Sequence, residues 1–121
     1  MGLILADTNI VIYSIAGLQQ IEPYINEYNF SVSEITIIEL LGVKGIEDFT
    51  LQKRKEFINH CYVYPFNSHI REIVILLKQK YILKIPDAII AASALHYDIP
   101  LLTADKEFKK IKELEAIILE L

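Results

Sequence analysis

The sequence predicts an α/β fold in which helices cover both faces of a mostly parallel β-sheet. Short apolar segments typical of buried strands alternate with helical segments along the whole chain. No repeat, low-complexity stretch or linker interrupts this alternation, and the length of 121 residues is that of one ordinary domain. We therefore expect residues 1–121 to form a single three-layer α/β/α sandwich.

The first elements follow directly from the apolar pattern. Residues 3–6 (LILA) have the pattern of a buried strand, and the next helix begins at Asp7 or Thr8 and ends at Gly17. A short amphipathic helix is expected over roughly 18–28.

The middle of the chain continues the alternation. A small strand is expected around residues 30–32, and Ser33 is a suitable N-cap for the helix that follows and ends near Gly42 or Gly45. The charged residues within 47–60 indicate a surface helix.

The last part contains the most apolar helix. A strand over 61–66 is halted by Pro65, and a helix over 68–81 has Ser68 as its expected cap. The helix over 85–98 is apolar on nearly every side, which places it centrally. The final elements are a strand over 99–105, a helical turn over 105–111 and a strand over 114–121.

Composition favours a protein without a membrane span. Apolar residues make up 53% of the chain and the mean hydropathy is +0.34, but the apolar runs are too short to cross a bilayer. Asp7 interrupts the apolar N-terminus, so no signal peptide is expected. The single cysteine, Cys61, excludes an internal disulfide, and its apolar surroundings indicate a packed thiol. These features predict a cytoplasmic protein.

The acidic balance argues against a generally basic nucleic-acid-binding surface. The formal net charge is −4 and the isoelectric point is near 5.3. Four acids gathered in one pocket would account for the whole excess, and a bound cation would cancel much of it. The charge therefore leaves a nuclease open.

Four acids follow, or lie within, apolar stretches: Asp7, Glu39, Asp87 and Asp105. An isolated buried carboxylate is costly, whereas several together are tolerable around a cation. Carboxylates favour a hard divalent ion, Mg²⁺ or Mn²⁺, which points to hydrolysis of phosphate esters. Asp7 and Asp105 follow strands, and ligands of open parallel sheets bind at that end of the strands.

Each acid also has a structural explanation. Asp7 and Asp105 could cap the helical segments that follow them, and Asp87 stands in a first helical turn, where an acid favourably meets the helix dipole. Glu39 lies inside a helix on an apolar stripe, where capping does not explain it. An edge position with the carboxylate in solvent stays open for Glu39. A shared site explains all four acids at once.

The neighbouring polar residues leave more than one role open. Thr8, Asn9 and Thr103 could orient a carboxylate or bond locally, and Glu107 is either an outer ligand or a solvated acid. The three histidines have no ligand spacing and receive no catalytic role. Lys84 and Lys106 each stand close to a site acid and are candidates to meet phosphates.

Four short motifs occur in an order that matches a known family. They are D-T-N (Asp7 to Asn9), E-L (Glu39 and Leu40), P-D-A-x-I-A-A-x-A (Pro86 to Ala94) and T-x-D (Thr103 to Asp105) followed by K-E-F. With these motifs the chain resembles PIN-domain ribonucleases over nearly its whole length, in particular the small toxins of the VapC type.

The resemblance implies a function and a set of partners. Asp7, Glu39, Asp87 and Asp105 would be the catalytic, metal-binding quartet beside a parallel five-stranded sheet. The expected activity is endoribonucleolytic cleavage with one or two Mg²⁺ or Mn²⁺ ions, leaving a 5′-phosphate and a 3′-hydroxyl. The expected partners are RNA, an antitoxin protein encoded beside the toxin and a second copy of the chain.

Departures from the family pattern leave the RNA specificity open. Ala104 stands where many relatives carry a polar or basic residue, and the chain is somewhat short. Among other classes, a phosphorelay receiver would need an acid pair after the first strand, and a haloacid-dehalogenase-type phosphatase would need an acid where Asn9 stands. The alternative within this fold is a non-catalytic PIN-like module that acts only through protein or RNA contacts.

Overall fold

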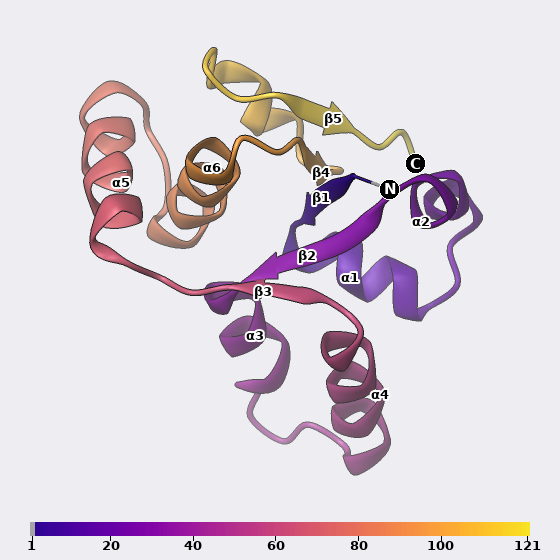
Figure 1. Cartoon of the computed structure of the whole chain (residues 1–121). Helices are drawn as coiled ribbons and strands as arrows, with labels where there is room; N and C mark the ends of the chain where they lie inside the picture. The colour runs from indigo at the N-terminus through magenta and orange to yellow at the C-terminus, as the bar shows by residue number, and fades with distance from the viewer. Residues whose placement is uncertain (1) are drawn as a thin grey trace.

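Five parallel strands form one sheet in the order β3-β2-β1-β4-β5, with six helices around it (Figure 1). This arrangement, seen in a computed structural model that describes residues 2–121, confirms the predicted three-layer sandwich and five-stranded sheet. The strands are β1 (Leu3–Ala6), β2 (Asn29–Ser33), β3 (Tyr62–Tyr64), β4 (Leu101–Thr103) and β5 (Ala116–Ile118). The helices are α1 (Thr8–Ile15), α2 (Glu22–Glu27), α3 (Glu34–Leu41), α4 (Asp48–Asn59), α5 (Ser68–Lys80) and α6 (Ile85–Tyr97), with 3₁₀ turns η1 (Gln19–Ile21) and η2 (Lys106–Lys110).

The central strands are buried on both faces because alternate residues enter two separate cores. Leu5 and Leu101 pack on one side with residues of α5, α6 and η2. Ile4, Ala6 and Leu102 pack on the other side with α1 and with Leu40 of α3, among others. Alternation along a strand therefore distributes apolar side chains to both helical layers. Figure 1 shows α5 and α6 together on one side and α1 and α4 on the other.

The predicted helix α6 is as central as its composition suggested. Six of its residues are buried: Ala88, Ile90, Ala91, Ala92, Ser93 and Ala94. Small alanine side chains let α6 lie close to the sheet and to α5, with which it packs most extensively. This packing fixes the start of α6, which carries Asp87.

Local signals were correct in most places and wrong in two. Ser33 caps α3 as predicted, since its hydroxyl accepts from Ile35 N at 3.3 Å. The predicted cap Ser68 is wrong: Asn67 caps α5 through a bond from Ile70 N at 2.9 Å. The amide of Asn67 reaches that donor from an extended backbone.

The second difference lies in the segment over 18–28, which is not one helix. A 3₁₀ turn precedes α2, and Pro23 occupies the first turn of α2. Proline is accepted there because the first turn needs no intrahelical N–H bond. The helix α3 ends at Leu41 and is followed by Gly42. A Cβ atom at position 42 would come within 2.6 Å of Ile38 O, so this position favours glycine.

The strand order places the site. The chain runs outward from β1 to β2 and β3, then crosses to β4 on the opposite side of β1. This reversal makes β1 and β4 the switch point of the sheet, beyond whose carboxyl ends ligands bind in such folds. Both strands end beside residues singled out above, Asp7 and Asp105.

None of the helices within residues 2–121 combines the length and the apolar character that a membrane crossing requires.

Candidate functional site

The four acids line one open pocket at the switch point. Its volume is about 150 Å³, and its walls are Asp7, Thr8, Asn9, Glu39, Asp87, Ile90, Asp105 and Phe108. The acids come from four separate segments, spread over nearly one hundred positions of the chain. The fold thus brings together the four acids that the sequence predicted for one site.

Asp7 is both a cap and a pocket residue. Its Oδ1 accepts from Ile10 N at 3.0 Å, which caps α1, and its Oδ2 accepts from the hydroxyl of Thr103. The parallel pairing of Ala6 with Leu102 sets this contact, because the residues that follow each of them then lie side by side. Asp7 is only 6% exposed, and its burial raises its pKa despite these two bonds. Negative charge on Asp105 and Asp87 adds to the effect.

Thr103 links two of the acids. Its hydroxyl donates to Asp7 and accepts from Asp105 N at 3.0 Å. Asp105 in turn caps η2, where its Oδ1 accepts from Glu107 N at 2.9 Å. Thr103 therefore does more than end a strand, and it orients both neighbours at once.

Glu39 is tied to the start of α1 through the hydroxyl of Thr8. Thr8 Oγ1 lies 2.7 Å from Glu39 Oε1 and 3.2 Å from Thr36 Oγ1. Because a hydroxyl has one proton, Thr8 donates to the carboxylate and accepts from Thr36. The end of α3 is also held by Arg54, whose Nη1 donates to Leu40 O at 2.7 Å.

Asp87 lies in the first turn of α6 and is half-buried. Burial raises its pKa, and the nearby negative charges of Asp105 and Glu39 raise it further. Two cations, Lys84 and Lys110, act in the opposite direction. Burial is thus the main cause of the raised pKa values of Asp87 and Asp7, and the neighbouring acids add to its effect.

The four acids differ in their exposure to solvent. Asp7 is buried and Asp87 is half-buried, but Glu39 and Asp105 are exposed. Glu39 lies at the solvent edge of α3, the position that the sequence analysis left open for it, and it still lines the pocket. In residues 2–121 no three side chains of His, Cys, Asp or Glu are placed so that they would hold a metal ion as they stand.

The other polar residues considered for the site differ in whether they line the pocket. Asn9 lines the pocket, whereas Glu107 is exposed outside its walls and pairs with Lys110 at 3.3 Å. Of the histidines, His69 and His96 stack on each other with ring centroids 5.5 Å apart, away from the pocket walls.

Three residues that support the site were not singled out from the sequence: Thr36, Arg54 and Lys110. Thr36 and Arg54 act on their partners across 28 and 14 positions, so no local pattern marks them. Lys110 is one of several lysines in its segment, and only its half-buried position sets it apart.

Comparisons with known proteins agree with this geometry. Ribonuclease VapC of Rickettsia bellii (strain RML369-C) is 29% identical over 133 residues that span 100% of this chain and 98% of that protein. A toxin–antitoxin complex from Klebsiella pneumoniae contains a chain that is 28% identical with a TM-score of 0.79, covering 93% of this chain and 94% of that one. VapBC-1 from nontypeable Haemophilus influenzae matches at 25% identity and a TM-score of 0.81, over 96% and 97% of the two chains.

A family model extends the agreement from individual relatives to the pattern of a whole family. The model of the PIN domain matches residues 4–114, which include all four acids of the pocket. The resemblance inferred from the four motifs is thereby confirmed, and this chain belongs to the PIN domain family.

Proposed function

We propose that the chain, as a single nuclease domain over residues 1–121, is an endoribonuclease that uses Mg²⁺ or Mn²⁺ in the four-acid pocket. The convergence of Asp7, Glu39, Asp87 and Asp105 at the switch point carries the proposal. Membership of the PIN domain family and the similarity to a protein named ribonuclease VapC support it.

The donor set fits a hard divalent cation. All four acids offer carboxylate oxygens, which Mg²⁺ and Mn²⁺ prefer. Burial, and to a lesser extent neighbouring acids, raise the pKa values of Asp7 and Asp87, and a bound cation would oppose both effects by favouring the ionised carboxylates. Two of the acids, Glu39 and Asp105, are exposed, so a cation can reach the pocket from solvent.

The residues of the chain hold and orient the reacting groups. Thr103 fixes Asp7, and Thr8 fixes Glu39, so the two carboxylates face the pocket in set orientations. A divalent cation bound there would polarise the scissile phosphate and the attacking water. The pocket is lined by no histidine or cysteine that would serve as a nucleophile, which suits direct hydrolysis by water.

Cations beside the pocket favour a phosphate-bearing substrate. Lys84 and Lys110 act electrostatically on Asp87, and Lys106 is exposed directly after Asp105. Although the net charge is −4, local positive charge at the pocket rim would meet the phosphates of RNA.

The direct test compares two isosteric substitutions on one helix. Asp87→Asn should lower Mg²⁺-dependent RNA cleavage by at least about 100-fold, because it removes a ligand charge from the pocket. Asp98→Asn removes the same charge at the opposite end of α6, where the residue has φ 53°, a conformation that asparagine accepts. The cleavage is measured on purified proteins with Mg²⁺ and with EDTA. Equal cleavage by Asp87→Asn and Asp98→Asn would refute the assignment.

A non-catalytic PIN-like module is the second candidate. The observation in its favour is that, within residues 2–121, the acids as they stand do not form a group of three that would hold a metal. Such a module would bind RNA or protein without turnover. Wild-type protein free of Mg²⁺-dependent cleavage, yet folded, would support this candidate over the enzyme.

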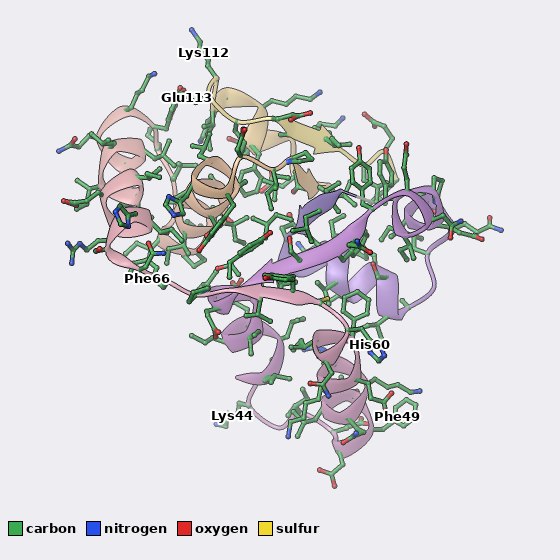
Figure 2. All side chains as sticks on the ribbon, viewed as in Figure 1. Lys44, Phe49, His60, Phe66, Lys112 and Glu113 are labelled. Atoms are coloured by element: carbon green, nitrogen blue, oxygen red, sulfur yellow. The ribbon has the colours of Figure 1, made fainter. Side chains whose placement is uncertain are left out.

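We further propose that the chain works in the cytoplasm with an antitoxin protein and as a homodimer. Relatives are known from structures described as toxin–antitoxin complexes. The surface also carries exposed apolar side chains that a partner would cover, among them Phe49 on α4 and Phe66 before α5 (Figure 2).

Coexpression with the product of the adjacent short gene tests the partners. The two proteins should copurify, and growth arrest caused by this chain alone should be relieved. Light scattering should give the chain alone a mass of twice 13.9 kDa. A monomeric protein that does not copurify with the product of the adjacent gene would contradict both partner assignments.

A further inference from the structure

Lys110 differs from the other lysines of its segment. It ends η2 and is half-buried with 35% of its side chain exposed, whereas Lys106, Lys109 and Lys112 are exposed. A lysine commonly buries part of its carbon chain and leaves its ammonium group mobile in solvent, so bonds that hold this group in one place need an explanation. The contacts of Lys110 are therefore informative about its role.

The ammonium group of Lys110 joins two segments that lie close in sequence to acids of the pocket. Nζ donates to Ile82 O at 2.6 Å and contacts Glu107 Oε2 at 3.3 Å. Glu107 N in turn donates to Asp105 Oδ1. Ile82 belongs to the α5–α6 connection, only a few residues before Asp87. The bonds of Lys110 thus span from the turn that carries Asp105 to the approach to α6.

The α5–α6 connection is held partly by Tyr81 and Leu83, which pack against the core, and partly by bonds to its backbone. The side chain of Ile82 is 92% exposed. Lys78 donates to Leu83 O at 2.6 Å, but it comes from α5 and ties the connection only to its own helix. Tyr81 contacts Glu113 at the outer edge of the same corner, where Figure 2 shows Lys112 and Glu113.

The charge of Lys110 also reaches the pocket. Lys110 and Lys84 are the two cations that counter the negative charges around Asp87. If Lys110 acted only through its positive charge, it would repel a metal ion and weaken metal binding. If it positions two of the metal ligands, it would strengthen metal binding. The two roles therefore predict opposite signs for the effect of removing Lys110.

We propose that Lys110 is a positioning residue, which sets the distance between Asp87 and Asp105 by fastening the α5–α6 connection to η2. This inference rests on the proposed metal-dependent function and deepens it. Lys110 touches neither carboxylate in the bonds described above, so it acts through the backbone that carries them.

The test compares Lys110→Met with Lys109→Met, which removes the same charge from an exposed neighbour in the same turn. Mg²⁺ affinity is measured without RNA, from the rise in melting temperature as Mg²⁺ is titrated. Lys110→Met should weaken Mg²⁺ binding about ten-fold, the usual effect of losing a residue that orients ligands. Loss of charge alone, as in Lys109→Met, should increase the Mg²⁺ affinity, and by less than about five-fold.

Two further measurements distinguish a positioning role of Lys110 from a general destabilisation of the protein by its loss. Hydrogen exchange in metal-free Lys110→Met should quicken at Ala88, whose amide bonds to Lys84 O at 2.9 Å, and stay unchanged in β1. Lys110→Arg, which keeps a charged donor, should restore Mg²⁺ affinity to within about two-fold. If Lys110→Met does not fold, Lys110→Gln, with a shorter neutral donor, gives the same comparison.

The outcomes distinguish this inference from the proposed function. If the wild type binds Mg²⁺ and cleaves RNA but Lys110→Met matches or exceeds its Mg²⁺ affinity, the positioning role is overturned and the nuclease stands. If the wild type neither binds Mg²⁺ nor cleaves RNA, the proposed function fails and the role of Lys110 fails with it.

Discussion

Asp7→Asn should lower RNA cleavage on the order of 10³-fold while leaving the metal-free protein at least as stable as the wild type. The loss of activity follows from the position of Asp7, the most buried of the four acids and the one at the end of the central strand β1. A neutral amide is a far weaker ligand for a hard cation than a carboxylate.

The stability of Asp7→Asn follows from the bonds of the carboxylate. Asparagine keeps an oxygen that can accept from Ile10 N, so the cap of α1 survives. Its amide can donate to the hydroxyl of Thr103, which has accepting capacity left beside its bond from Asp105 N. The substitution also removes a buried charge whose pKa is raised by burial and by neighbouring acids.

The combination of these two effects is diagnostic. Activity and the free energy of unfolding should change in opposite directions, which a misfolded variant would not show. Cleavage assays and urea unfolding of the same preparations, both in parallel with Asp98→Asn, provide the measurement. Cleavage at the wild-type level would indicate either a contaminating nuclease or a site elsewhere.

The sequence was sufficient to predict the fold and the four acids of the pocket because both depend on local patterns. Apolar runs that end in an acid mark β1 and the segment around β4, and the parallel pairing of these strands then brings Asp7 near Asp105. The order of the four motifs linked these positions to Glu39 and Asp87, which no spacing argument alone would have joined.

The exposure and the supporting contacts of the acids were beyond local patterns. The apolar neighbours of Glu39 suggested burial, but α3 ends at Leu41 and leaves its carboxylate at the solvent edge. The contact of Thr36 with Thr8 and the reach of Lys110 to Ile82 both depend on how separate segments pack. Such contacts span 28 positions each and have no signature in sequence.

The folded state of the metal-free protein should lose stability as the pH rises through the raised pKa values, and Mg²⁺ should restore it. Asp7 and Asp87 both have pKa values raised in the folded state, so the folded protein binds more protons than the unfolded chain where these groups titrate. Their contribution is fully present below the ordinary carboxyl pKa and is lost as pH rises through the raised values. In metal-free protein, this pair therefore disfavours the folded state at neutral pH.

A divalent cation should reverse that loss, since it competes with protons for the same oxygens. At pH 7.5, Mg²⁺ at 100 times its dissociation constant should add about 2.7 kcal/mol, a rise in melting temperature of roughly 10 °C. At pH 4.5 the rise should be less than about half as large, because protons then compete more strongly for Asp7 and Asp87, whose pKa values are raised. Thermal melts of the wild type and Asp7→Asn at both pH values isolate the pocket, since acids elsewhere are common to both proteins. An equal response to Mg²⁺ at the two pH values, or in the two proteins, would show that the cation binds somewhere other than these carboxylates.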